Sequence, residues 1–182
     1  GYELNIPSEQ ALHVYDRIVE AGEAFGLRHA GLKALASLRL EKGYRDYGHD
    51  IDNMDDPYST GLGFAVRLDK PSEFIGKQAC IERKANPHFS HRLVQILLQD
   101  PEPLMVHQEI VLRNGVPIGD VRAASYGHTL GGAVGLAMIA GDPVDSEYLE
   151  TGQWEVDIAG RRYPAVVSLK PFYDPGMSRV RA

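Results

Sequence analysis

The sequence predicts an α+β front segment followed by an all-β module that closes as a small barrel or a jelly-roll-like domain. Apolar residues recur at helical spacing only before residue 85, whereas beyond residue 90 they alternate in short runs between turn signals. Between the two regions, residues 85–90 (Ala-Asn-Pro-His-Phe-Ser) carry a turn signal of their own. We therefore expect two domains, at residues 1–84 and 91–182.

The first elements are expected to be a strand and an amphipathic helix. Alternation with polar residues predicts a strand that buries Tyr2, Leu4 and Ile6. Pro7 ends this strand, and Ser8 offers an N-cap for a helix over residues 9–24, with Gly26 among its stop signals. Because residue 1 is glycine and the strand pattern begins at once, we expect the chain to be a fragment or a processed product.

The rest of the front segment is expected to hold two more helices and a strand. A helix from about Ala30 ends at Gly43 and carries an apolar stripe of Leu32, Leu35, Ala36 and Leu38. Residues 44–60 are rich in Asp, Asn and Tyr, which predicts an irregular connection. Residues 62–68 then alternate like a strand, and residues 74–84 have the pattern of a short helix.

The second module is predicted to consist of short strands at regular spacing. The alternating runs are Leu93–Leu98, Glu109–Arg113, Ile118–Ala123, Ala133–Ala140, Glu155–Ile158 and Tyr163–Leu169. Asn114-Gly115 is a strong hairpin signal, and Ala159-Gly160 marks a second hairpin turn. This pattern is typical of a small barrel or sandwich.

The composition is that of an ordinary globular protein, with 43% hydrophobic residues, 24% charged residues and a formal net charge of -6. The excess of acids argues against a nucleic-acid partner. No apolar run approaches the ~20 residues of a membrane span, so we expect no membrane partner. Cys80 cannot form an internal disulfide, and we interpret it as a structural thiol in a reducing compartment: the cytoplasm, or the mitochondrial matrix of a eukaryote.

Generic catalytic and metal motifs are missing from the sequence. It contains no Gly-x-Gly-x-x-Gly loop after a strand, no Walker loop, no Gly-x-Ser-x-Gly elbow and no Cys-x-x-Cys pair. The seven histidines fit no ligand spacing such as His-Glu-x-x-His. We therefore expect no metal site.

Two charged residues stand out as binding candidates. Glu3 is the only charge in a strand whose other face is apolar; a carboxylate fixed there accepts two parallel N–H bonds from a flat, guanidine-like edge. The alternative is a strand residue that faces solvent. Arg39 lies between Leu38 and Leu40 and precedes Glu41, so it either pairs with a neighbour on the helix or binds an anion.

Two polar loops combine aromatic rings with hydrogen-bonding groups. One holds Tyr44, Tyr47 and the turn Gly48-His49-Asp50-Ile51, and is interpreted either as a binding loop or as a packed loop with a capping Asp. The other is Ser125–Thr129, between two strands of the β module.

Several short motifs occur in a fixed order along nearly the whole chain. They are Gly1-Tyr2-Glu3-Leu4, Leu38-Arg39-Leu40-Glu41-Lys42-Gly43-Tyr44, Gly48-His49-Asp50-Ile51, Gly61-Leu62-Gly63-Phe64, Phe74-Ile75-Gly76-Lys77, Asn114-Gly115-x-x-Ile118-Gly119, Tyr126-Gly127-His128-Thr129 and Lys170-Pro171-Phe172-Tyr173-Asp174-Pro175. This order resembles the aminomethyltransferase (glycine-cleavage T-protein) family. Residues 61–71 and the Tyr126–Thr129 segment look more like the C-terminal folate-binding region of sarcosine and dimethylglycine dehydrogenases than like stand-alone T-proteins.

The resemblance implies that residues 1–84 are the back part of a T-protein-like folate-binding domain. In such dehydrogenases an FAD-containing front half oxidises an N-methyl amine, and the folate region captures the one-carbon unit on tetrahydrofolate as 5,10-methylenetetrahydrofolate. FAD would then bind in a part of the protein that precedes this chain. Folate is the partner expected for this chain, and the N-methyl amine is the substrate expected for the full-length protein.

The resemblance also implies roles for individual residues. Glu3 would pair with the N–H edge of the pterin ring, and Arg39 and Tyr173 would lie at the folate site. The outer candidates are Tyr2, Tyr44 and His49. The family's catalytic aspartate lies upstream of the Gly-Tyr-Glu motif, so the resemblance implies no catalytic residue on this chain and no catalysis by the fragment alone.

Other functions remain compatible with the same motifs. One is a stand-alone aminomethyltransferase that works with a lipoyl-carrying protein. Another is a folate-dependent demethylase that acts on a sulfonium compound. The third is a non-catalytic binding module of the same fold, because fold alone does not fix function.

Overall fold

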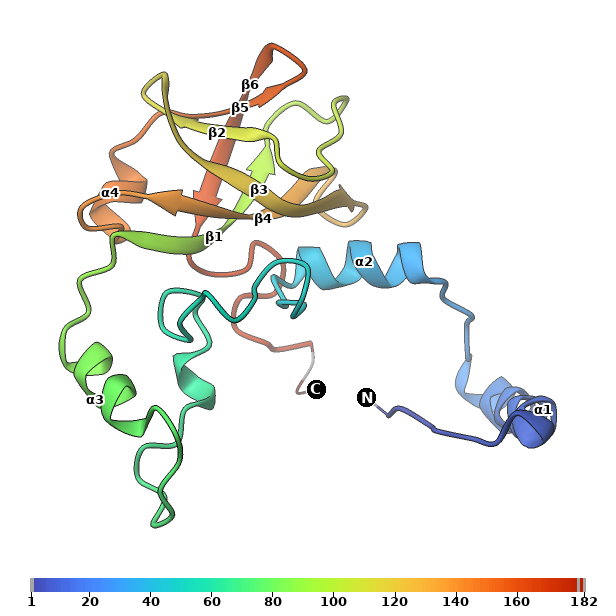
Figure 1. The fold of residues 1–182 in the computed structure, drawn as a ribbon. Coiled ribbons are helices and arrows are strands. Elements are labelled where there is room, and N and C mark those ends of the chain that lie inside the picture. Colours follow the sequence, from blue (N-terminus) through green and yellow to red (C-terminus); the bar gives the residue numbers. More distant parts are fainter. Residues whose placement is uncertain (1, 180, 182) are drawn as a thin grey trace. The chain divides into compact units, whose positions relative to one another are not determined.

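The computed structural model describes residues 2–179 and 181. The chain divides into two compact units, Gly1–Lys33 and Ala34–Ala182. Figure 1 traces the elements in chain order. This division separates groups of residues that contact one another and does not test the domain boundary expected at residues 85–90, which stays a prediction.

The first unit is helical. A short 3₁₀ turn, Ser8–Gln10, leads into α1 (Ala11–Gly22), and a second 3₁₀ turn follows at Glu23–Phe25. Gly26 ends the segment in the left-handed region at φ +69°, as the stop signal predicts. The predicted helix is thus confirmed, but Ser8 is not its N-cap: Gln10 holds that position, because the 3₁₀ turn extends the helical path upstream.

The predicted first strand is wrong. Residues 2–7 have no regular structure, and the side chains expected to be buried are not, since Tyr2 is fully exposed and Leu4 is 60% exposed. A strand needs a hydrogen-bonded neighbour, and none of the described residues pairs with this segment. Gly1, the first residue of the motif, lies outside the described residues.

Helix α2 (Leu32–Glu41) is confirmed, but it buries a different face from the one expected. Leu35 and Leu38 of the apolar stripe are exposed, whereas Ser37, Leu40 and Glu41 are buried. The hydroxyl of Ser37 donates to the carbonyl of Tyr126 at 2.6 Å. The helix therefore packs on the β module through a face that combines polar and apolar side chains. The polar ones can be buried because they find hydrogen-bond partners on the β module.

Residues 44–60 form an irregular connection, as predicted, with a single bridge between Tyr47 and Ile51. The strand expected at residues 62–68 is wrong, because this stretch contains a 3₁₀ turn at Gly63–Ala65. Backbone bonds such as Val66 N to Gly63 O, at 3.2 Å, occupy groups that a strand would offer to a neighbour. The third helix, α3 (Lys77–Ala85), is confirmed with a slightly later start.

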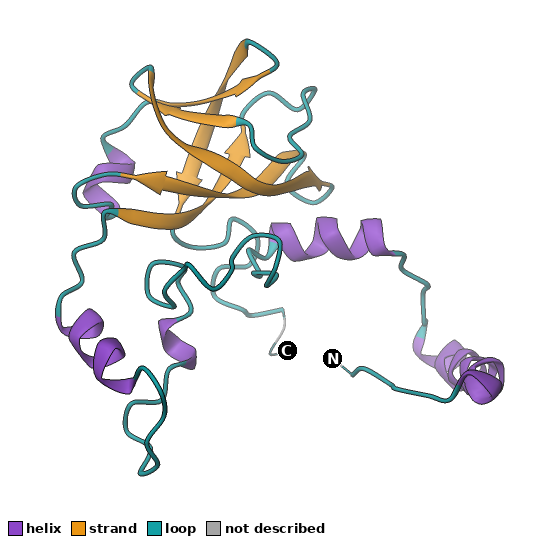
Figure 2. Ribbon diagram, in the orientation of Figure 1, coloured by secondary structure: helices purple, strands orange, loops and turns teal. Residues whose placement is uncertain are grey.

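The second module is a closed barrel, as expected (Figure 2). Its strands are β1 (His91–Leu98), β2 (Ile110–Arg113), β3 (Val116–Gly127), β4 (Gly132–Ala140), β5 (Trp154–Ile158) and β6 (Arg161–Ser168). They pair antiparallel in the order β1-β4-β3-β2-β5-β6, and the barrel closes where β6 pairs with β1. Asn114 and Gly115 adopt φ +52° and +78°, as the hairpin between β2 and β3 requires.

The interior of the barrel is apolar and fully enclosed. Its buried side chains include Val94, Ile96, Val111, Val121, Ile139 and Val156. A short helix, α4 (Ser146–Glu150), between β4 and β5 was not expected from the sequence. Strand β3 also runs further than predicted, so that Ser125, Tyr126 and Gly127 of the expected polar loop belong to the strand. None of the helices in the described part of the chain is both long and apolar enough to cross a membrane.

Candidate functional site

A cavity of about 540 Å³ opens beside the C-terminal half of α2. It lies wholly within the second unit. Its walls come from α2, the segment just after the helix, the β3–β4 turn and the C-terminal tail, and are formed by Leu35, Leu38, Arg39, Glu41, Lys42, Tyr44, Thr129, Tyr173 and Arg179. Leu35 and Leu38 of the predicted apolar stripe therefore form one wall of this cavity.

The end of α2 fixes the start of the cavity wall. Gly43, at φ +64°, follows the helix, and the backbone N–H groups of Gly43 and Tyr44 donate to the carbonyls of Leu40 and Arg39, each at 3.0 Å. This is the Schellman arrangement, which satisfies carbonyls that a helix end leaves unpaired. It places Tyr44 directly after the helix, beside the cavity.

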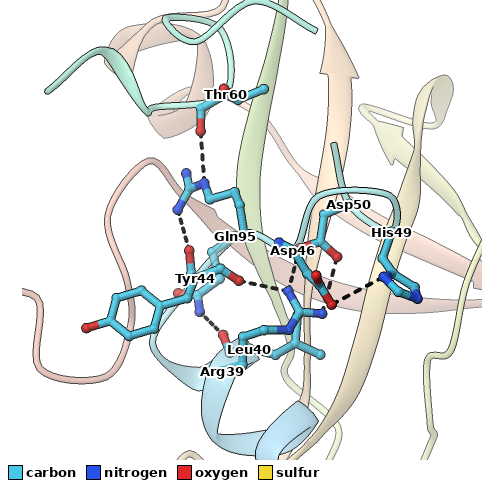
Figure 3. Close-up of polar contacts among 10 residues, drawn as sticks. Arg39, Leu40, Tyr44, Asp46, His49, Asp50, Thr60 and Gln95 are labelled. Carbon is cyan, nitrogen blue, oxygen red and sulfur yellow. Dashed lines mark hydrogen bonds and ion pairs between the residues drawn. The ribbon is translucent and has the colours of Figure 1, made fainter. Parts of the chain in front are cut away.

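Arg39 forms an ion pair with Asp50 of the connection, not with Glu41 of its own helix (Figure 3). One terminal nitrogen contacts Asp50 and also donates to the carbonyl of Tyr44 at 2.8 Å, and the other donates to Asp50 at 3.3 Å. A guanidinium has five N–H donors, so these bonds use three of them. The Asp50 carboxylate is fully buried and compensates the charge of Arg39.

The connection after α2 is held by further buried polar groups. Asp50 also accepts the backbone N–H of Asp46 at 2.8 Å, which is the capping role considered for it. Arg45 donates to the carbonyls of Thr60, at 2.8 Å, and Gly43. Burial lowers the pKa of the Arg45 guanidinium, and the charge of Asp50 opposes this shift.

Gln95 of β1 joins the helix end to the C-terminal tail, and Figure 3 shows it beside Leu40 at the helix end. Its amide nitrogen donates to the carbonyls of Leu40 and Glu41, at 2.6 and 3.1 Å, and its oxygen accepts the backbone N–H of Phe172 at 2.5 Å. The side chain is buried, so each of these bonds replaces water that cannot reach the groups. One barrel side chain thus fixes two walls of the cavity.

Glu41 joins the helix to the β3–β4 turn. It is 2% exposed, and its carboxylate accepts the backbone N–H groups of Thr129 and Leu130, at 2.6 and 3.0 Å, and the hydroxyl of Thr129 at 3.0 Å. A Cβ at Gly127 would lie 3.1 Å from the Glu41 carboxylate. Glycine at this position therefore gives the carboxylate room to reach the turn.

Lys42 joins the helix to the tail. Its ammonium donates to the carbonyl and the carboxylate of Asp174, at 2.5 and 3.2 Å. Burial alone would raise the pKa of the Asp174 carboxyl, but hydrogen bonds from Ser178, Lys42 and the backbone of Arg179 outweigh it and lower this pKa to about 2. The tail beside the cavity is therefore held by an ionised carboxylate.

The structure brings together three of the residues singled out in the sequence. Arg39, Tyr44 and Tyr173 all line the cavity. Glu3 and Tyr2 belong to the first unit, where both side chains are exposed. His49 is also exposed, on the loop that carries Asp50, and its ring nitrogen lies 3.2 Å from Asp46.

Several cavity residues were not identified from the sequence. Arg179 lies in a tail without periodicity, and among the described residues its guanidinium forms no ion pair. Glu41 and Thr129 lie in motifs that were noted, but a contact between residues 88 positions apart leaves no local signal. The exposed stripe of α2 was the one available signal. Across the described residues, no three His, Cys, Asp or Glu side chains are grouped to hold a metal ion.

Two family models match the chain. Residues 1–70 match the GCVT N-terminal domain, and residues 91–174 match the glycine cleavage T-protein C-terminal barrel domain. The second match coincides with the closed barrel. A crystal structure of glycine cleavage system aminomethyltransferase T from Bartonella henselae has the same fold, with a TM-score of 0.75 and 22% identity over 93% of this chain and 45% of that one.

Several curated relatives match this chain along its entire length, among them an oxidase and a dehydrogenase. The 4-methylaminobutanoate oxidase (formaldehyde-forming) of Paenarthrobacter nicotinovorans is 49% identical, and the mitochondrial sarcosine dehydrogenase of Homo sapiens is 34% identical. The chain spans 21% of the length of the oxidase and 20% of that of the dehydrogenase. It therefore corresponds to about a fifth of each relative.

Proposed function

This chain belongs to the glycine cleavage T-protein family, and from that premise we propose that it is the folate-binding part of a larger flavin-dependent oxidoreductase. The full-length protein would oxidise an N-methyl amine. This part would capture the released one-carbon unit on tetrahydrofolate as 5,10-methylenetetrahydrofolate. The observation that carries the proposal is the cavity beside α2, whose lining combines an apolar wall and two tyrosines with three cations.

The lining suits a reduced folate. A folate has flat ring systems at one end and glutamate carboxylates at the other, so it needs apolar surface and positive charge in one site. Leu35, Leu38, Tyr44 and Tyr173 provide the former. Arg179 provides a guanidinium that forms no ion pair in the part of the chain that the structure describes, and a guanidinium binds a carboxylate through two parallel N–H bonds.

The chain's own residues would bind and orient the folate. Arg179 would hold a carboxylate of the glutamate tail, while Arg39, already compensated by Asp50, would donate N–H bonds. Tyr44 and Tyr173 would pack against the rings, and His49 would be an outer contact. Independently of this cavity, the family resemblance assigns Glu3 to the N–H edge of the pterin ring and Tyr2 to an outer contact. Bound tetrahydrofolate supplies the nitrogen atoms that take up the one-carbon unit.

That this chain is part of a larger oxidoreductase is proposed from two relatives of which it spans about a fifth. One of them is named for oxidising an N-methyl amine and forming formaldehyde, and the other is named for dehydrogenating sarcosine. Flavin would bind outside this chain, where the amine site would also lie, so no residue described above takes part in the oxidation. The proposed compartment is the cytoplasm, or the mitochondrial matrix in a eukaryote.

A stand-alone aminomethyltransferase is the second candidate, and the matches to both T-protein family models are equally compatible with it. The two candidates differ in flavin, so the first test is the intact mass and the visible spectrum of the natural full-length gene product. A chain several times longer than this one with flavin bands supports the oxidoreductase. A short, colourless product overturns it and favours the aminomethyltransferase, a demethylase or a binding module.

The folate site is tested separately, by titrating the full-length protein with 5-formyltetrahydrofolate, a stable reduced folate. We expect Arg179→Gln to weaken binding about tenfold, because it removes a charge-assisted contact. Arg67→Gln is the matched control, since Arg67 is exposed and pairs with Asp69. Glu3→Gln is expected to cost about 1–3 kcal/mol of binding free energy, because a neutral amide replaces the charged acceptor of the pterin N–H edge. Unchanged affinity in both variants would contradict the proposed site.

A further inference from the structure

The β3–β4 turn presents to the cavity a hydroxyl group whose proton is already engaged. Thr129 lines the cavity, and its hydroxyl lies 3.0 Å from the Glu41 carboxylate. A carboxylate accepts hydrogen bonds but donates none. The Thr129 hydroxyl is therefore the donor in this bond, and it has only one proton to donate. Only its lone pairs are then available to a ligand.

The surroundings of Glu41 hold this arrangement in one direction. Its other oxygen accepts two backbone N–H groups, from Thr129 and Leu130. In the described part of the chain, no lysine or arginine forms an ion pair with Glu41, although it is 2% exposed. A buried carboxylate satisfied by three donors of a single turn is oriented by that turn and orients it in return.

The motif Tyr126-Gly127-His128-Thr129 explains how the helix and the turn meet. The carbonyl of Tyr126 accepts from Ser37, one turn before Glu41 on α2. Gly127 leaves the space that the Glu41 carboxylate occupies, since a Cβ there would also lie 3.2 Å from the Glu41 Cγ. Residues of this motif therefore provide the surface on which the buried face of α2 packs.

We infer that Glu41 is a positioning residue, which fixes the Thr129 hydroxyl as a hydrogen-bond acceptor for an N–H or O–H donor of the bound folate. This inference rests on the proposed function, because it concerns the ligand of the same cavity. It assigns Glu41 no contact with the ligand. Glu41 would affect folate binding only through the Thr129 hydroxyl. Variants at position 129 can therefore separate this effect from a purely structural one.

Glu41→Gln preserves the shape of the side chain but reverses one hydrogen bond. The amide oxygen still accepts from the backbone, whereas the amide nitrogen donates to the Thr129 hydroxyl, whose proton then faces the cavity. A donor of the ligand would meet a second donor. We expect this variant to bind 5-formyltetrahydrofolate about tenfold more weakly than the unmodified full-length protein.

The test is a double-mutant cycle with Thr129→Val, which removes the hydroxyl. We expect Thr129→Val to weaken binding to a similar extent, Thr129→Ser to retain it, and Glu41→Gln to cause no further loss in the Thr129→Val background. Glu102→Gln, at an exposed position away from the cavity, is the matched control. The thermal midpoint of each variant is recorded alongside, so that loss of folding is recognised.

Three outcomes would overturn the inference. The first is that Glu41→Gln binds the folate as well as the unmodified protein does. The second is that the losses of affinity from Glu41→Gln and Thr129→Val add in the double variant, as a purely structural role of Glu41 predicts. If Glu41→Gln does not fold, the serine and valine variants decide: equal affinities at position 129 overturn it. Failure of the unmodified protein to bind the folate is a distinct result, because it overturns the proposed function first.

Discussion

The barrel and the region around the cavity are stabilised in opposite ways. The barrel closes through backbone hydrogen bonds between neighbouring strands and encloses side chains such as Val94 and Ile139, which have no exposed surface. The cavity region, by contrast, is held by buried polar side chains such as Gln95 and Glu41, each of which contacts two or more backbone groups. Stability and site geometry therefore depend on different residues.

The largest effect is expected in the barrel. Ile96 is completely buried, so Ile96→Ala should lower the free energy of unfolding by about 2–5 kcal/mol through lost contacts and a cavity. The measurement is hydrogen exchange of the β1 and β4 amides in the full-length protein. Val166→Ala, at a position 37% exposed, is the control and should cost much less. Equal losses would mean that the barrel interior is not the main source of stability.

A smaller loss of stability with a larger loss of binding is expected at Gln95. Gln95→Leu keeps the approximate volume but leaves the Phe172 N–H and the α2 carbonyls without this partner, at a cost of about 1–3 kcal/mol. Because the helix end and the tail both lose their anchor, affinity for 5-formyltetrahydrofolate should fall about tenfold. Exposed Gln99, changed to Leu, is the comparison. Normal folate affinity in Gln95→Leu would mean that buried polar side chains do not hold the geometry of the cavity.

The smallest effect is a dependence on pH. The pKa of Asp174 is lower in the folded state, about 2, than in an unfolded chain, roughly 4. Its contribution to stability is therefore complete above roughly pH 4 and is lost as the pH falls through about 2. Exchange protection of the Ser178 and Arg179 amides should decrease over this window. In Asp174→Asn it should already be low at pH 4 and change little below it.

The barrel could be predicted from the sequence because its signals are local. Alternation over a few residues and the Asn114-Gly115 turn define the strands, and half of the strand pairings join consecutive strands. The same alternation misled at residues 2–6 and 62–68. In the former, no described strand supplies a partner; in the latter, short-range bonds such as Leu62 N to Pro57 O, at 2.6 Å, close a turn instead.

The cavity could be predicted only in part. The resemblance to a family pointed to Arg39, Tyr44 and Tyr173, which do share one cavity. The partner of Arg39 was not foreseen, because Asp50 lies beyond the helix and a helical neighbour was the simpler choice. Glu41 and Thr129 meet only through the fold, and no periodicity in a single sequence encodes such a contact.

The contact between Glu41 and Thr129 also sets an order of events during synthesis. The two residues are 88 positions apart. At roughly 5–20 residues per second, α2 leaves the ribosome several seconds before the turn that will receive its buried face. During that interval Glu41 remains in water, and the cavity has no wall on that side. A nascent chain stalled just before residue 129 should accordingly have no competent site for a folate.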